Sequence, residues 1–421
     1  MFAICLRLLC CFAACFLVTA AGDCKRGEPE GCGVRSVRWY SETLTMNLLT
    51  AANVKFAVDL FKELDKDDKV GNIFVSPFSI SAALAMVYLG AKGNTATQIA
   101  KVLGFDGVKD IHAEYQKLQT ELINPKAEHV LKLANRLYGE QTYNFLADFL
   151  AASLKHYQAG LGAVDFLKAA EAARQEINSW TEEQTAGKIQ NVLEKDIVGS
   201  DTRLVLVNAI YFKAKWKDTF KKEDSFTGQF KLNQSITKEL EMMQQTGSFL
   251  YFHNREFAFK IIELPYVQDE LSMIILLPDD NNGLETLQRS FTLNRLRNWT
   301  NPKNMSWTSV QVTLPKFKLE EKYDLSSILP NLGMVDAFDS KKANFSGMSE
   351  GKDLSVSKVI HQSFVEVNEE GTEAAAATAV TMVLTSAMFS PEEFKADHPF
   401  LFFIRHAKTQ SILFYGRLTS P

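Results

Sequence analysis

The positions of the cysteines limit most strongly what this chain can fold into. All cysteines lie near the N-terminus, and residues 33–421 contain none. A disulfide scaffold, or a zinc or iron–sulfur site with cysteine ligands, is therefore excluded from the bulk of the chain. Because 46% of the residues are hydrophobic, a packed apolar core is available to hold the fold instead. The six cysteines are Cys5, Cys10, Cys11, Cys15, Cys24 and Cys32.

The N-terminus has the pattern of a targeting segment. Residues 8–21 are almost wholly apolar or small, follow Arg7, and offer small residues up to Ala20 for a signal-peptidase cut. This pattern predicts a cleaved signal peptide over residues 1–20 and a secreted, extracellular protein. If translation began at Met46 instead, the protein would stay in the cytoplasm.

A short N-terminal extension, residues 21–45, would follow the signal peptide. It retains Cys24 and Cys32, which could pair with each other, pair with another chain, or stay as free thiols. We expect a monomer. The sequence does not decide whether Cys24 or Cys32 forms a disulfide. No later segment supplies the roughly 20 apolar residues of a membrane-spanning helix, so no membrane partner is expected.

The rest of the chain has helical patterns first and strand patterns later. Apolar residues at Ala57, Leu60, Phe61 and Leu64 recur at helical spacing, in a helix that Thr50 could cap. Later runs are typical of buried strands, which together predict an α+β fold. The expected strands are residues 204–212, 271–278, 310–314, 399–404 and 411–415.

No motif in the sequence indicates a cofactor or a metal site. The seven histidines include no H-E-x-x-H pair, and no Walker A sequence occurs, so we expect no metal and no cofactor. The net charge of −4 gives no electrostatic reason to expect nucleic acid as a partner. Glycosaminoglycan is not expected either, because Lys117 is set between Glu114 and Glu121 and no basic stripe is visible.

One pattern is typical of a serine esterase. Ser349 lies in G-x-S-x-G, and Asp397 and His406 follow in the order used by α/β-hydrolases. A nucleophile elbow must lie between a buried strand and a helix, whereas the residues on both sides of Ser349 are polar and typical of loops. We therefore interpret this pattern as a Gly/Ser turn.

The segment 374–391 does not fit an ordinary core element. It carries no charge, but it is flanked by glutamates on both sides. Its first part favours helix and its second part favours strand, so it is either an Ala-rich helix entering a buried strand or a segment able to occupy two states. If it were extended, Thr372 and the alternate residues up to Val380 would give one face of small, buriable side chains.

At this segment the sequence resembles the serpin family, and the resemblance extends in order along residues 46–421. It is closest to the ovalbumin branch of that family. For a domain 46–421 it implies a serpin fold, with helices packed on three β-sheets and an exposed reactive loop near the C-terminus. The motifs are residues 72–80, 177–180, 185–189, 207–216, 314–317, 343–348, 367–377 and 396–402.

The resemblance implies an inhibitor of serine proteases that acts as a suicide substrate, and not an enzyme. The target protease would cleave the loop and form a covalent acyl-ester, after which the freed loop would insert into the central sheet. Small or medium apolar residues in the loop suggest an elastase-like or chymotrypsin-like target. The alternative is a non-inhibitory serpin with a chaperone, storage or carrier role, although the small residues throughout the hinge argue against it.

The resemblance also assigns residue roles. The family's spacing from Glu369 places the scissile bond at Thr385–Ser386, with Leu384–Thr385 and Met388–Phe389 as alternatives. The hinge would be Glu369, Glu370, Gly371, Thr372, Glu373, Ala374, Ala375, Ala376 and Ala377. A polar cluster under the opening of the sheet, called the shutter, would contain Ser76, Ser79, Asn208 and His361, and Trp216 would lie with Glu369 at the point of insertion, called the breach.

Glycosylation is a further expectation for a secreted chain. Four N-x-S/T sequences occur, and Asn298 and Asn304 lie in a polar stretch that predicts a surface loop able to carry glycan.

Overall fold

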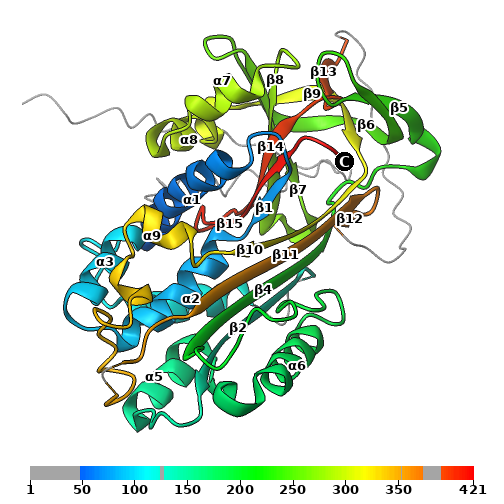
Figure 1. Cartoon of the computed structure of the whole chain (residues 1–421). Coiled ribbons are helices and arrows are strands. Elements are labelled where there is room, and N and C mark those ends of the chain that lie inside the picture. The colour runs from blue at the N-terminus through cyan, green and yellow to red at the C-terminus, as the bar shows by residue number, and fades with distance from the viewer. Residues whose placement is uncertain (1–47, 124–127, 352, 373–389) are drawn as a thin grey trace, which may run out of the picture. The chain divides into compact units, whose positions relative to one another are not determined.

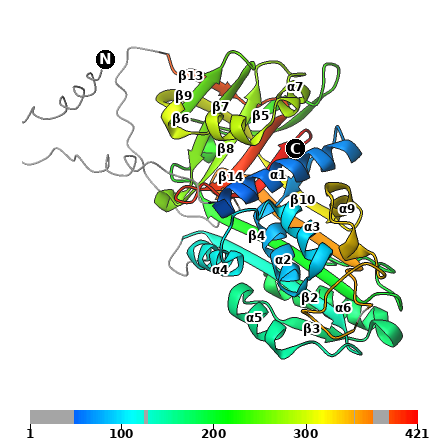
Figure 2. The ribbon, with the colours of Figure 1, turned by 90° about the vertical axis from the view of Figure 1, so that its left-hand side faces the viewer.

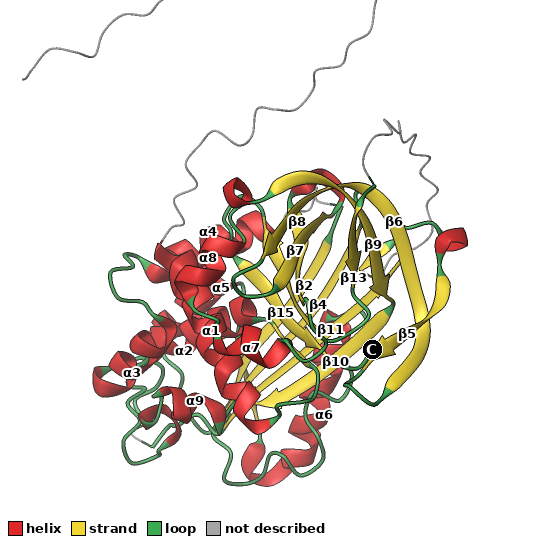
Figure 3. Ribbon diagram, turned by 90° about the horizontal axis from the view of Figure 1, so that it is seen from above, coloured by secondary structure: helices red, strands yellow, loops and turns green. Residues whose placement is uncertain are grey.

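The computed structural model describes residues 48–123, 128–351, 353–372 and 390–421 (Figure 1). The predicted signal peptide, Cys24, Cys32 and the predicted scissile bond therefore lie outside the described residues, as do hinge positions 373–377. Most helices of the described chain gather to one side of the strands (Figure 3). The helices are α1 (Leu48–Asp67), α2 (Pro77–Gly90), α3 (Gly93–Leu103), α4 (Ile111–Leu122), α5 (Ala147–Tyr157), α6 (Phe166–Gln184), α7 (Leu284–Arg289), α8 (Leu293–Trp299) and α9 (Ile328–Leu332).

Helix α2 lies in the core, where it supports the sheets (Figure 2). The Ser76 side chain caps it by accepting a hydrogen bond from the Ser79 amide at 3.2 Å, and Pro77 occupies its first turn. All of its residues except Tyr88 and Leu89 are buried, as expected for a helix that is apolar on every side.

Helix α1 shows the apolar stripe that the sequence predicts. Ala57, Leu60, Phe61 and Leu64 are all buried. The predicted cap at Thr50 is wrong, because Leu48 and Leu49 are already helical and Thr50 therefore lies inside the helix. The Thr50 side chain instead lies 3.3 Å from the hydroxyl of Ser411.

One sheet of the described chain has six strands, and its long strands lie side by side in Figure 1. A small core cluster fills the space between this sheet and α6, and the opposite face packs on the main core. In spatial order the strands are β10 (Phe317–Asp324), β11 (Lys358–Asn368), β12 (Gly371–Thr372), β4 (Leu204–Lys215), β2 (Val130–Glu140) and β3 (Leu161–Val164).

The other sheet has nine strands. Eight follow one another as β1 (Ile73–Val75), β15 (Ile412–Leu418), β14 (Phe400–His406), β8 (Leu271–Pro278), β7 (Phe259–Pro265), β6 (Thr237–Asn254), β9 (Ser306–Pro315) and β13 (Glu392–Lys395). The ninth, β5 (Phe226–Lys231), pairs with β6 outside this order.

The expected three sheets correspond to two hydrogen-bonded sheets in the described chain. Strand β6 is 18 residues long and continues from one expected sheet into the next. Its first part pairs with β5, its middle part with β9, and its end with β7. The helical first half, the strand-rich second half and all five predicted strands are confirmed.

Candidate functional site

The candidate site is the seam between β11 and β4. These strands pair in parallel from Lys358 opposite Val205 to Phe364 opposite Tyr211. Above that point they separate, and β12 lies between them, paired antiparallel with both (Figure 1). The seam is therefore closed along most of its length and already holds two residues of a further strand at one end.

Strand β12 is fitted closely into this opening. Thr372 is fully buried, and its hydroxyl lies 2.8 Å from that of Tyr266. The Tyr266 ring stacks on Trp216, with centroids 4.6 Å apart and planes 7° apart. Trp216 in turn donates from its indole nitrogen to the Asn368 carbonyl at 2.9 Å, so one chain of contacts fixes the start of β12.

Gly371 is required at this position for two reasons. Its φ is +150°, which side chains rarely allow, and a Cβ would lie 2.1 Å from the carbonyl oxygen of Ala214. We expect Gly371→Ala to lower the free energy of unfolding of the uncleaved protein by about 1–3 kcal/mol, as measured by urea denaturation. Gly160→Ala is the matched control, because a Cβ there meets nothing within 4 Å. Equal denaturation midpoints for both variants would contradict this role of Gly371.

The predicted breach residues meet above the seam. The backbone amides of Trp216 and Phe220 donate to the carbonyls of Glu370 and Glu369 at 3.0 and 2.9 Å. The Glu369 carboxylate accepts from the Ser225 hydroxyl at 2.8 Å and pairs with Lys316 at 2.7 Å. Burial opposes ionisation of Glu369, but the hydrogen bonds from Lys316 and Ser225 outweigh burial and lower its pKa.

The predicted shutter residues also lie together, under the closed part of the seam. His361 accepts a hydrogen bond at Nε2 from the Ser76 amide at 3.1 Å, so Nδ1 carries the proton and donates to Oδ1 of Asn208. The Asn208 amide group donates to Ser79. The Ser76 hydroxyl donates to the Leu413 carbonyl at 2.6 Å, which links the cluster to the other sheet. Opening the seam must break the His361–Asn208 bond, because the two residues are opposite partners on β11 and β4.

Burial lowers the pKa of His361 to about 3, so the neutral ring is the native form. The unfolded chain takes up this proton below its ordinary pKa of about 6.5, and stability is therefore lost as the pH falls from about 6.5 towards 3. Between pH 7 and pH 5 we expect His361 to account for a loss of about 2 kcal/mol. Urea denaturation at both pH values should show a smaller pH dependence for His361→Gln than for the parent. Equal dependences would contradict the assignment.

Several residues of the site were not singled out by the sequence. Asn135 and Tyr323 extend the His361–Asn208 pair into a row across four strands, and Tyr266 and Lys316 complete the breach. Lys316 does stand within a motif of the resemblance. The others have no local signal, because only the register of the strands brings them to the seam.

The esterase pattern is not assembled into a catalytic group. The Ser349 hydroxyl donates to the carbonyl of Asn144 at 2.9 Å. Asp397 lies 2.9 Å from the ring nitrogen of its neighbour His398, and His406 contacts Thr409 at 2.9 Å. The interpretation of Ser349 as part of a turn therefore agrees with its contacts.

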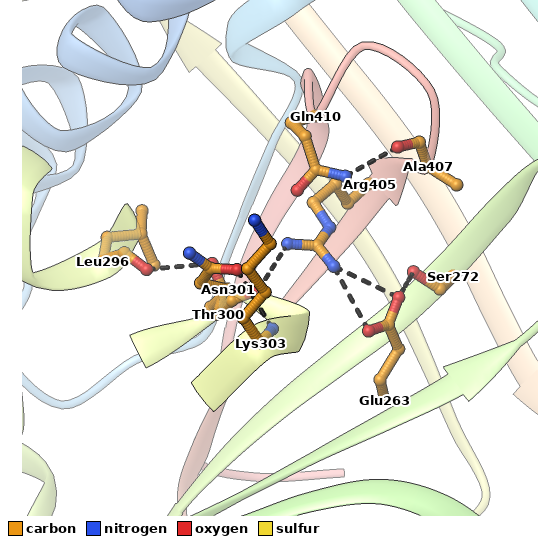
Figure 4. Close-up of polar contacts among 9 residues, drawn as sticks. All are labelled: Glu263, Ser272, Leu296, Thr300, Asn301, Lys303, Arg405, Ala407 and Gln410. Atoms are coloured by element: carbon orange, nitrogen blue, oxygen red, sulfur yellow. Dashed lines mark hydrogen bonds and ion pairs between the residues drawn. The ribbon is translucent and has the colours of Figure 1, made fainter. Parts of the chain in front are cut away.

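A second buried polar cluster belongs to the nine-stranded sheet (Figure 4). Arg405 donates to the Thr300 carbonyl at 2.8 Å and to both carboxylate oxygens of Glu263 at 3.2 Å. The Ser272 hydroxyl donates to the same carboxylate at 2.6 Å. A cavity of about 100 Å³ lies beside Arg405, between α1, α8, β14 and β15. The cluster ties the end of α8 to this sheet and does not contact the seam.

The chain matches the family described as serpin (serine protease inhibitor) over residues 51–421. It belongs to the serpin family. Horse (Equus caballus) leukocyte elastase inhibitor is 55% identical over 381 residues, which cover 89% of this serpin and 100% of that protein. The serpin is thus a protease inhibitor and not an enzyme.

Solved structures agree with this assignment. The crystal structure of uncleaved ovalbumin is 40% identical, with a TM-score of 0.83 over 89% of this serpin and 100% of that chain. The loop-inserted structure of a cleaved ovalbumin mutant is 39% identical, with a TM-score of 0.78 over 89% and 100%. Among the described residues of this serpin, no helix is both long and apolar enough to cross a membrane.

Proposed function

We propose that this serpin inhibits an elastase-like or chymotrypsin-like serine protease by acting as a suicide substrate. The protease cleaves the predicted loop and becomes trapped as an acyl-ester, because the freed loop inserts between β11 and β4. The relatives named leukocyte elastase inhibitor support this target class, as do the small and medium apolar residues around Thr385.

The observation that carries this proposal is the register of β12. Thr372 pairs with Val367 on β11 and with Ala214 on β4. If an inserting strand kept this register along the seam, Ala375 would lie between Phe364 and Tyr211. These two residues already oppose each other in the closed ladder. Insertion therefore requires β11 and β4 to separate, but not to slide along each other.

In this proposal, the shutter residues would lie beside a polar residue of the inserted strand. In an inserted strand that kept the same register, Thr378 would lie between His361 and Asn208, which are hydrogen-bonded in the closed seam. The hydroxyl of Thr378 could then replace part of the bond that separation breaks. We propose Glu369 and Trp216 as the breach, and Ser76, Ser79, Asn208 and His361 as the shutter.

Incubation with an elastase, a chymotrypsin and a trypsin tests this function. We expect an SDS-stable complex with elastase or chymotrypsin, and mass spectrometry should find a released C-terminal peptide that begins at Ser386. A peptide that begins at Thr385 or Phe389 would support the alternative bonds. A protease with its catalytic serine replaced by alanine is the control and should form no stable complex. Cleavage without complex formation would instead indicate a non-inhibitory serpin.

We propose further that residues 1–20 act as a signal peptide ahead of a serpin domain over residues 46–421, and that Asn298 and Asn304 carry glycan. Both asparagines are exposed, although Asn304 donates to the Asn298 carbonyl at 2.8 Å. N-terminal sequencing of protein from the medium and from the cell lysate tests secretion. Material that starts at Met46 and is found only in the lysate would support the cytoplasmic alternative.

A further inference from the structure

An aromatic pair closes the upper end of the seam. Phe364 and Tyr211 are the last opposed residues of the β11–β4 ladder, directly below β12. Their rings lie 6.1 Å apart at 55°, and both side chains are buried on the face that packs against α6. This pair must separate first when a strand extends β12 along the seam.

Two lysines place their charges near the Phe364 ring from different parts of the fold. The Nζ of Lys318 lies 4.9 Å from the ring centroid, and that of Lys188 lies 5.7 Å from it. An ammonium group at such a distance over an aromatic face is attracted by the negative potential of the ring. The two contacts with the ring are alike in chemistry, and Lys318 also lies 3.7 Å from the Glu320 carboxylate on its own strand.

The two lysines differ in which side of the seam they belong to. Lys318 is on β10, which pairs with β11, so it stays with Phe364 when the seam opens. Lys188 is on the segment that joins α6 to β4, and the main chain of this segment is bound to α6 by Asn178, which bonds both backbone groups of Leu193. Helix α6 packs on β2, beyond β4 (Figure 1). The Lys188 contact therefore crosses the seam, whereas the Lys318 contact does not.

We infer that Phe364, Tyr211 and Lys188 form a latch that sets how fast the seam opens for loop insertion. This inference rests on the proposed function. A contact that exists only while the seam is closed stabilises the closed state and so slows opening. The Lys318 contact exists before and after opening and has no such effect. Lys188 is a positioning residue, because it acts through Phe364.

The latch can be tested by the rate at which an acetylated synthetic peptide with the sequence of residues 372–385 anneals to the full-length protein at 37 °C. Native gels, or the rise in thermal midpoint that annealing causes, would follow the reaction. We expect Phe364→Leu to accelerate annealing by about three- to tenfold, since an aromatic pair is lost. Lys188→Met should accelerate it by about two- to fivefold, and Lys318→Met by less than about 1.5-fold.

A second measurement separates the latch from general loosening of the fold. With elastase, Lys188→Met should lower the number of inhibitor molecules consumed per protease trapped, because insertion competes better with deacylation. The rate of the first cleavage should not change. Equal acceleration by Lys188→Met and Lys318→Met, or none by Lys188→Met and Phe364→Leu, would overturn the latch and leave the proposed function intact. Failure of the parent to take up peptide would overturn both.

Discussion

Replacing Thr372 by arginine should convert the protein from an inhibitor into a substrate. Thr372 is fully buried, and its hydroxyl meets that of Tyr266 at 2.8 Å under the stacked Trp216 ring. A guanidinium group buried there without a partner costs several kcal/mol, so we expect β12 to leave the seam in the uncleaved variant and insertion to bear this cost. Since each 1.4 kcal/mol slows a step about tenfold, insertion should slow by at least about 100-fold and lose its competition with deacylation.

The measurement is the yield of SDS-stable complex against the yield of cleaved, free inhibitor. We expect Thr372→Arg to give cleaved product almost exclusively, with the rate of loop cleavage close to that of the parent. Thr372→Val is the matched control, because it keeps the size of the side chain and loses only the contact with Tyr266. It should retain most of the complex. Undiminished complex formation by Thr372→Arg would rule out insertion at this seam.

The sequence predicted the parts of the fold that depend on local pattern. Uncharged apolar runs identified β8 and most of β4 because a strand buried on both faces needs them. The length of β6 was not predicted. Its first five residues are exposed or half-buried on both faces, and nothing local in the sequence marks where its pairing changes from β5 to β9 and then to β7. The number of sheets depends on such pairings between distant strands, and the local pattern of apolar and polar residues does not encode them.

The candidate site was predicted through resemblance rather than through pattern. His361 and Asn208 are far apart in the sequence, and only the parallel register of β11 with β4 makes them partners. Asn135 escaped prediction for the same reason, since an isolated asparagine in a strand carries no signal until the strand is paired. Conversely, Ser349 matched a catalytic motif whose other members contact different residues.

Cleavage of the loop should stabilise the protein strongly. In the uncleaved form, β11 and β4 share one ladder from Lys358–Val205 to Phe364–Tyr211. An inserted strand would replace that ladder by two, one with each neighbour, and would bury its small-residue face. About ten new ladder residues, at 0.5–1.5 kcal/mol for each net hydrogen bond, give a gain on the order of 10 kcal/mol. The thermal midpoint should rise by roughly 13 °C.

Calorimetry of intact and cleaved protein measures this gain, and cleaved Thr372→Arg is the control that should show little of it. We expect cleavage to raise stability and not to lower it, because a strand that enters in the register of β12 requires no sliding of β11 along β4. The uncleaved state must then be held by a kinetic barrier rather than by its own free energy. Equal midpoints before and after cleavage would mean that the seam stays closed, and that β12 marks a fixed end of the sheet.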